Sequence, residues 1–90
     1  MKFILTWTVK PKNRDESCQR LQAKADKLAI EGIKVLGHWY NVNLLGGWAL
    51  VEADSEATIA KWLLDWTNLN INDVTLVVEH NELLDIWSRR

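Results

Sequence analysis

The chain has 90 residues, and 11 Lys and Arg side chains against 12 Asp and Glu give it a formal net charge of -1 at pH 7. This length predicts a single domain over residues 1–90, and the balanced charge lacks the basic field that binding to a phosphate backbone needs, which argues against a nucleic-acid partner. No apolar run reaches the ~20 residues of a membrane span, the N-terminus is too short and polar for a signal peptide, and the lone cysteine, Cys18, cannot form an internal disulfide. We therefore expect a cytoplasmic protein without a membrane partner.

The first predicted elements are a strand and an amphipathic helix. Residues 2–9 alternate in hydropathy and end at Lys10-Pro11, which predicts a strand with one fully apolar face: Phe3, Leu5, Trp7 and Val9. Asn13 followed by Glu16 resembles a capping box, and Gly32 supplies a helix end. Between them the apolar stripe recurs at helical spacing: Cys18, Leu21, Ala25, Leu28 and Ala29. We interpret Cys18 as a core residue on this stripe, because a small buried thiol is more common there than a nucleophile.

A hairpin, a second helix and a last strand are predicted next. Residues 33–40 and 46–53 read as antiparallel strands, with Gly46-Gly47 as the hairpin hinge. Asp54 or Ser55 caps a helix that ends at residues 68–70, and its apolar stripe faces the sheet: Ile59, Trp62, Leu63 and Trp66. Residues 73–79 read as a strand, and a short amphipathic tail with Leu83, Leu84 and Trp87 then needs a surface to cover.

This order of elements predicts an α+β fold. Right-handed crossovers through both helices give an antiparallel sheet of order 4-1-3-2 with both helices on one face, a ferredoxin-like βαββαβ sandwich. Trp7, Trp39 and Trp48 are expected to face a buried surface. The face opposite the helices is assigned Ile4, Thr6, Leu36, His38, Ala49, Val51 and Val77, with Gly37 at a bulge that would flip the assignment in its strand. Because an exposed face this apolar usually marks an interface, we expect a homodimer in which the two sheets pack against each other.

Short phrases over nearly the whole chain resemble a family of small bacterial domains of unknown function, family 3303. They are Met1-Lys2-Phe3 leading to Thr6-Trp7, Pro11 through Asn13-Arg14-Asp15, Gly37-His38-Trp39, Gly46-Gly47-Trp48-Ala49-Leu50-Val51-Glu52, and Trp62 to Trp66. The resemblance implies a relation to the dimeric α/β-barrel superfamily, and with it a ferredoxin-like monomer and a sheet-on-sheet dimer. It implies no reaction, because fold analogy alone supports no activity.

Two residues are catalytic candidates. His38 stands beside Trp39 and Tyr40, and an imidazole next to aromatic walls can act as a general base or as an anchor for a ligand. The alternative is a histidine at a dimer interface or strand edge, bonded to backbone. Glu52 ends the third predicted strand, and if it neighboured Thr6 or Thr8 it would pair with His38 or orient a polar substrate group. The alternative is an ordinary exposed carboxylate.

Six Trp residues are more than a two-layer monomer of this size can readily bury. This surplus predicts a site for an apolar or aromatic small molecule, with these candidate ligand-binding side chains: Trp7, Trp39, Tyr40, Trp48, Trp62 and Trp66. A packed core is the alternative. No cofactor and no metal are expected, because His38 and His80 lie on different strands without ligand spacing, and haem rests on analogy alone.

Three functions remain open. The first is a small dimeric protein that binds an apolar or aromatic molecule, or a protein partner, through Trp-rich surfaces. The second is a cofactor-independent enzyme of the dimeric α/β-barrel type, monooxygenase-like or isomerase-like, with His38 as base. The third is a structural dimerisation module.

Overall fold

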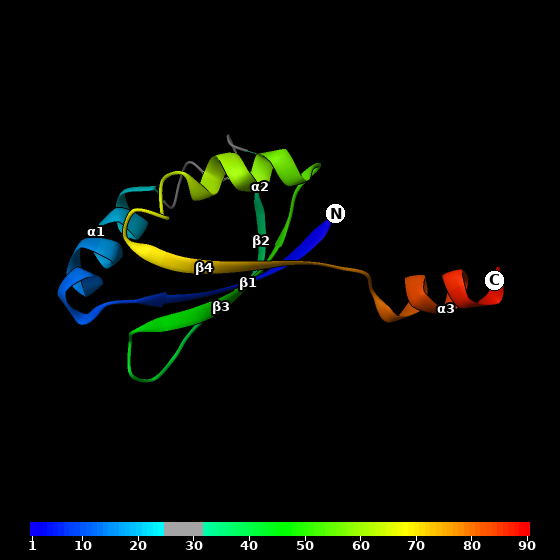
Figure 1. Cartoon of the computed structure of the whole chain (residues 1–90), viewed down its shortest axis with the longest axis horizontal. Helices are drawn as coiled ribbons and strands as arrows, with labels where there is room; N and C mark the ends of the chain where they lie inside the picture. Colours follow the sequence, from blue (N-terminus) through cyan, green and yellow to red (C-terminus); the bar gives the residue numbers. More distant parts are fainter. Residues whose placement is uncertain (25–31) are drawn as a thin grey trace.

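The computed structural model describes residues 1–24 and 32–90, and within them all helices but the last lie over one face of a four-stranded sheet (Figure 1). The strands are β1 (Lys2–Val9), β2 (Lys34–Tyr40), β3 (Gly46–Glu52) and β4 (Asn70–Val77). The helices are the 3-10 turn η1 (Pro11–Asn13), then α1 (Arg14–Lys24), α2 (Glu56–Leu63) and α3 (His80–Ser88). The strand order is β2-β3-β1-β4 and every neighbouring pair is antiparallel, so the predicted ferredoxin-like fold is confirmed.

Local chemistry explains where the elements begin. Ser55 is the N-cap of α2, and its hydroxyl oxygen accepts a hydrogen bond from the Thr58 backbone N–H at 3.2 Å. The strand β4 begins at Asn70, three residues earlier than the sequence predicts, because Asn70 pairs with Val9 at the end of β1. The predicted stripe positions Ala25, Leu28 and Ala29 lie outside the described residues.

The core lies between the sheet and the helices. Its buried members are Phe3, Leu5, Ile33, Ala49, Val51, Ala53 and Ile59, with Trp7, Trp62 and Leu63 packed against them. In the register of β1 and β3, Phe3 lies opposite Val51 and Leu5 opposite Ala49. Paired residues project to the same side of a sheet, so β3 turns its small residues toward the helices.

The predicted facing of β3 is therefore wrong. Ala49 and Val51, expected on the face opposite the helices, are buried beneath them. Trp48, expected to be buried, is 54% exposed and lies opposite Trp39, which is 58% exposed. We call this side of the sheet, turned away from α1 and α2, the open face; its residues include Ile4, Thr6, Trp39, Trp48 and Leu50.

The predicted bulge at Gly37 is present. The pairing of β2 with β3 shifts between Val35 and Gly37, so that His38 lies opposite Ala49 and Tyr40 opposite Gly47. His38, expected on the open face, is therefore on the helix side, because a one-residue slip moves every following side chain across the sheet. Trp39 is placed on the open face by the same shift.

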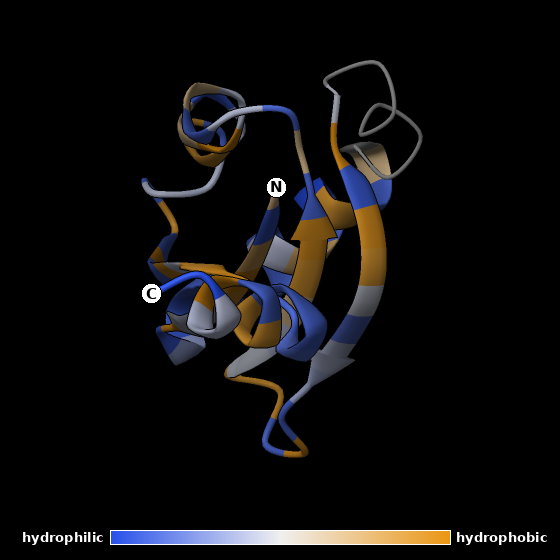
Figure 2. Ribbon diagram, turned by 90° about the vertical axis from the view of Figure 1, so that its right-hand side faces the viewer, coloured by the Kyte–Doolittle hydropathy of each residue, from blue (hydrophilic) through white to orange (hydrophobic). Residues whose placement is uncertain are grey.

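The helix α3 stands away from the sheet (Figure 1). A capping box between Glu79 and Glu82 begins it, and Leu83, Leu84 and Trp87 on the predicted amphipathic tail are all exposed. Figure 2 shows largely apolar strands, while α3, nearest the viewer, mixes hydrophobic and hydrophilic residues. The radius of gyration, 14.7 Å, exceeds the about 12 Å of a compact chain of this length because of this projecting arm. No helix among the described residues is long and apolar enough to cross a membrane.

Candidate functional site

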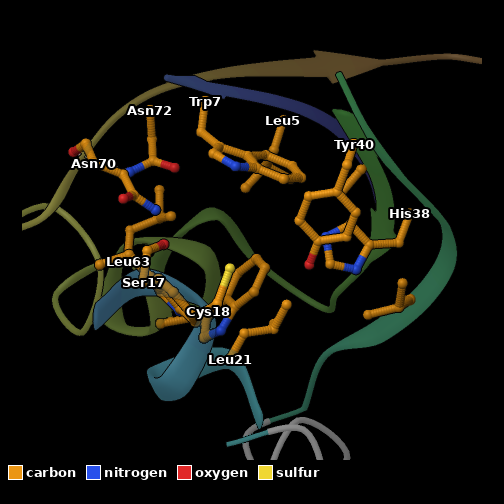
Figure 3. Close-up of a pocket in the computed structure, with 14 residues that line it drawn as sticks. Leu5, Trp7, Ser17, Cys18, Leu21, His38, Tyr40, Leu63, Asn70 and Asn72 are labelled. Atoms are coloured by element: carbon orange, nitrogen blue, oxygen red, sulfur yellow. Dashed lines mark hydrogen bonds between the residues drawn. The ribbon is translucent and has the colours of Figure 1, made fainter. Parts of the chain in front are cut away.

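A cavity lies between the helix side of the sheet and the helices α1 and α2 (Figure 3). Its volume of about 80 Å³ is room for roughly three water molecules at the ~30 Å³ that each occupies in the liquid, about the bulk of one small aromatic ring. The lining comes from the strands, from α1 and α2, and from the turns after α2. Its residues are Leu5, Trp7, Ser17, Cys18, Leu21, Val35, His38, Tyr40, Ala49, Trp62, Leu63, Trp66, Asn70 and Asn72.

Three rings form one end of the cavity, and we call Trp7, His38 and Tyr40 the rim cluster. The Trp7 ring meets His38 edge to face at 5.2 Å between centroids and meets Tyr40 at 5.8 Å. His38 and Tyr40 lie 4.9 Å apart and project from β2 on the same side, since they are two residues apart. Such pairs are worth about 0.5–1.5 kcal/mol beyond their buried area, so they fix the orientation of the imidazole.

The Trp7 ring is also fixed from the β3 side. A side-chain carbon at Gly47 would lie 2.6 Å from Cζ2 of Trp7, so the indole packs directly over the glycine backbone. The Gly46-Gly47 pair, predicted as a hairpin hinge, thus also makes room for the largest ring of the cavity. No other residue type leaves that space.

The cavity is uncharged at neutral pH. Partial burial lowers the pKa of His38 below its ordinary value of 6.5, so the imidazole is neutral. Burial raises the pKa of the Tyr40 hydroxyl, and the Coulombic effect of Cys18 adds to the rise. The described lining contains no Lys, Arg, Asp or Glu. A site of this kind favours a neutral ligand, because a charged one would lose its hydration without a counter-charge.

The other end of the cavity is closed by Trp66 and Asn70, and we call it the closed end. Trp66 is 8% and Asn70 7% exposed, whereas His38 and Tyr40 are exposed at the rim. Figure 3 shows Asn70 and Asn72 at the end opposite His38 and Tyr40. The Asn72 amide donates to the Asn70 backbone carbonyl at 3.4 Å.

Sequence reasoning missed the closed end's asparagines and the α1 residue Ser17. Asn70 and Asn72 are in phase with Val74, which lies opposite the buried Leu5. Two polar residues at core-facing positions of a strand could have indicated a polar part of the site, because a buried polar group needs a hydrogen-bond partner.

The cavity brings together the predicted residues Trp7, His38, Tyr40, Trp62 and Trp66. Trp39 and Trp48, also predicted to bind a ligand, lie apart from them on the open face.

Glu52 and Cys18 are placed differently from their predictions. Glu52 lies opposite Lys2 of β1 and Lys34 of β2, three residues along β3 from the position that faces His38, so the expected pairing with His38 is wrong. The neighbouring Val51 projects to the helix side, which puts Glu52 on the open face. Cys18, predicted in the core, is exposed and lines the cavity, because this turn of α1 lies over the cavity and not over the packed core.

Within residues 1–24 and 32–90, no three His, Cys, Asp or Glu side chains gather so as to hold a metal ion.

Comparison with solved structures supports the fold. A protein from Nitrosomonas europaea assigned to the antibiotic biosynthesis monooxygenases superposes with a TM-score of 0.58 at 7% identity, over 88% of this chain and 100% of its own. Another antibiotic biosynthesis monooxygenase gives 0.56 at 12% identity, over 88% and 100%. A NIPSNAP domain protein from Burkholderia xenovorans gives 0.50 at 10% identity, over 89% and 97%. Identities this low show a common fold and no common activity.

No curated protein matches the chain in sequence. A family model does match, over residues 1–90, and its description is "Domain of unknown function (DUF3303)". The match spans every strand and helix described above, and it bears out the resemblance read from the sequence phrases. The chain therefore belongs to the DUF3303 family.

Proposed function

We propose that this protein binds a small, uncharged and largely aromatic molecule in the cavity between its sheet and its helices. The observation that carries the proposal is the convergence of Trp7, Trp62 and Trp66 from three different elements on one uncharged cavity. Ligand sites are typically apolar concavities with a few well-placed polar groups, and this cavity has both. A ligand of about one ring makes few contacts, so we expect dissociation constants of about micromolar to millimolar.

The test uses toluene and p-cresol as ring-sized probes, with binding followed by the quenching of tryptophan fluorescence. Leu21→Phe fills the cavity from α1 with a ring of its own and should weaken both probes. Trp48→Phe changes a ring on the open face and is the matched control, which should leave the affinities unchanged. Binding that survives Leu21→Phe would place the probes elsewhere and contradict the proposal.

A second candidate function is catalysis with His38 as general base. It is favoured by one observation, the neutral imidazole of His38 held at the rim in an edge-to-face contact with Trp7. A neutral imidazole can accept a proton from a ring hydroxyl or from carbon beside a carbonyl, with no cofactor. Oxygen uptake or isomerisation measured on a panel of hydroxyaromatic compounds, and lost in His38→Gln, would support it. Equal turnover by the variant would exclude His38 as the base.

We further propose that the open face forms a homodimer, sheet against sheet. Trp39 and Trp48 lie side by side there, more than half exposed, and Ile4 lies opposite Leu50, the next open-face position of β3. A contiguous apolar patch of this kind marks an interface. Trp48→Glu should convert a dimer into a monomer in sedimentation velocity, with Trp48→Phe, which keeps an aromatic ring, as the matched control. If the cavity binds no probe while the dimer forms, the dimerisation module becomes the function.

The free thiol of Cys18 supports our proposal of a reducing, cytoplasmic location. A protein partner on the same Trp-rich open face is the competing use of that surface. Sedimentation of the purified protein distinguishes the two, because only self-association gives a dimer in the absence of other proteins.

A further inference from the structure

We propose that α3 packs its apolar side against the β2–β3 hairpin of a second copy of the chain. This pairing rests on the open-face homodimer proposed above and extends its interface to both ends of each sheet. We call residues 41–45 the hairpin tip. The hairpin tip and α3 both carry apolar side chains that are more than half exposed. They are Val42 and Leu44 on the hairpin tip, and Leu83, Leu84, Ile86 and Trp87 on α3.

The hairpin tip holds its apolar side chains outward in a fixed turn. The Leu44 N–H donates to the Asn41 carbonyl at 2.8 Å, and the Leu45 N–H donates to Oδ1 of Asn43 at 3.0 Å. Val42 is 99% exposed, and the backbone of Leu44 is left-handed, with a φ of 64°. Glycine adopts that conformation without strain, so a leucine there gives the monomer both strain and exposed apolar surface. A surface that covers this leucine in the dimer explains why it stands there.

The start of α3 is fixed as well. Two residues, Val78 and Glu79, connect β4 to α3. An ion pair between Lys2 and Glu79 ties this connection to β1, and the capping box between Glu79 and Glu82 orders the first turn of the helix. The helix therefore stands as an arm beyond the sheet, and its apolar side is available to another chain.

The two elements lie at opposite ends of the sheet. Figure 1 shows α3 beyond one end and the β2–β3 hairpin at the other, and in both Figure 1 and Figure 2 they lie lower than α2. A two-fold axis that lies between two facing sheets, and that crosses the line from the hairpin tip to α3, exchanges these ends. It brings the hairpin tip of each copy to α3 of the other, so the contact forms twice. The strands of the two sheets then run in nearly opposite directions, as aligned sheet packing allows.

The area of the open face explains why a second copy needs these ends. Four strands of seven or eight residues cover about 480 Å² in plan, from a spacing of about 4.8 Å and a rise of about 3.3 Å per residue. A standard interface takes roughly 800 Å² of accessible surface from each partner. Three of the open-face side chains are charged, namely Lys2, Lys34 and Glu52. The pairing of α3 with the hairpin tip adds apolar surface at both ends of this face.

Crosslinking between copies tests the pairing. All variants carry Cys18→Ser, so that the introduced cysteine is the only thiol of the chain. A tagged Leu44→Cys chain is coexpressed with an untagged Leu83→Cys chain and treated with a short bismaleimide. We expect a covalent dimer of one tagged and one untagged chain on a denaturing gel, and none from either variant alone. Leu64→Cys, at an exposed leucine after α2, is the matched control and should not link to Leu83→Cys.

A double-mutant cycle measures the contact in solution. Leu44→Ala and Leu83→Ala each remove the contact twice in a two-fold dimer, so each should raise the dimer dissociation constant about ten- to a hundredfold. The double variant should weaken the dimer by much less than the product of the two effects, because each substitution already removes the same contact. Leu64→Ala should stay within twofold of wild type. Sedimentation measures the constants, and circular dichroism checks that every variant is folded.

The outcomes separate this pairing from the dimer on which it rests. A wild-type dimer whose dissociation constant is unmoved by Leu44→Ala and Leu83→Ala would overturn the pairing and leave the open-face dimer in place. Links between like chains only, or equal linking by Leu64→Cys, would overturn it in the same way. A wild-type chain that sediments as a monomer at every concentration would overturn both.

Discussion

Gly47→Ala should destabilise the protein far more than Gly37→Ala, although both glycines lie in adjacent strands of the same sheet. A side-chain carbon at Gly47 would collide with the backbone carbonyl oxygen of Trp39 and would lie 2.6 Å from Cζ2 of Trp7. At Gly37, the nearest atoms all belong to the outer ring of Trp39. The two substitutions add the same methyl group, but the neighbours differ in their freedom to move.

The carbonyl oxygen beside Gly47 cannot yield without disturbing the ladder between β2 and β3, and the Trp7 ring is held by His38 and Tyr40. Overpacking of this kind costs about 1–3 kcal/mol, and the lower entropy of the unfolded alanine chain returns only about 0.4–1 kcal/mol. The Trp39 ring is 58% exposed and can rotate away from a methyl group at Gly37. We expect a net loss of about 2 kcal/mol for Gly47→Ala and less than about 0.5 kcal/mol for Gly37→Ala.

Urea unfolding at one protein concentration, followed by circular dichroism, measures the difference. With a slope of about 1–2 kcal/mol per molar urea, the Gly47→Ala midpoint should fall by about 1–2 M while the slope is unchanged. Sedimentation is measured alongside, since Trp39 lies on the face that we propose to dimerise. Equal midpoints for the two variants would refute the packing of Trp7 over Gly47, and with it the described shape of the cavity.

Three further outcomes are expected from local contacts. Ser55→Ala should lower the unfolding free energy by about 1 kcal/mol because it removes the cap of α2, and Ser55→Asp should restore most of it in the same urea assay. The lowered pKa of His38 means that the unfolded chain binds its proton more readily, so stability should fall as the pH drops below 6.5, and His38→Gln should flatten this part of the stability–pH curve. The Thr58 hydroxyl donates to Asp54 at 2.7 Å and lowers the pKa of that carboxyl below 3.8. The stability from this bond is present above pH 3.8 and is lost as the pH falls through the lowered pKa. Acid unfolding of Asp54→Asn compared with wild type measures this loss.

The fold was predictable because its determinants are periodic. The alternation of Phe3, Leu5 and Val9 identifies β1, and the spacing of Ile59 and Leu63 identifies the stripe of α2, with handedness rules supplying the order of the strands. The start of β4 was not predictable in this way. Asn70, Ile71 and Asn72 have the composition of a loop, and only their pairing with the end of β1 makes them a strand.

The candidate site was predictable in its aromatic parts and not in its polar ones. Trp62 and Trp66 follow from helical spacing, although α2 ends at Leu63 and Trp66 reaches the cavity from the turn beyond it. The placement of His38 and Tyr40 depends on the bulge at Gly37. The sequence indicates this bulge but does not say to which side of the sheet it turns the residues that follow. Nε1 of Trp66 and Oδ1 of Asn70 are buried without a hydrogen-bond partner in the described part of the chain, and this is a property of the assembled fold, because a hydrogen bond is missing only once every neighbour is in place.

The order of side-chain sizes along β3 explains both why the predicted facing of this strand is wrong and why a cavity lies above it. Apolar side-chain area alone would bury Trp48 and Leu50 and expose their smaller neighbours. The structure does the reverse: Gly47, Ala49 and Val51 face the helices, and Gly47 leaves the space that the Trp7 ring occupies. Small residues on a central strand leave room above them, and Ala49 is part of the wall of the cavity. The same alternation sends Trp48 to the open face, where it lies opposite the exposed Trp39 on the surface that we propose to dimerise. Exchanging the sizes at positions 48 and 49 would fill the cavity and remove the exposed ring together, so the ligand site and the dimer surface that we propose are two consequences of one strand.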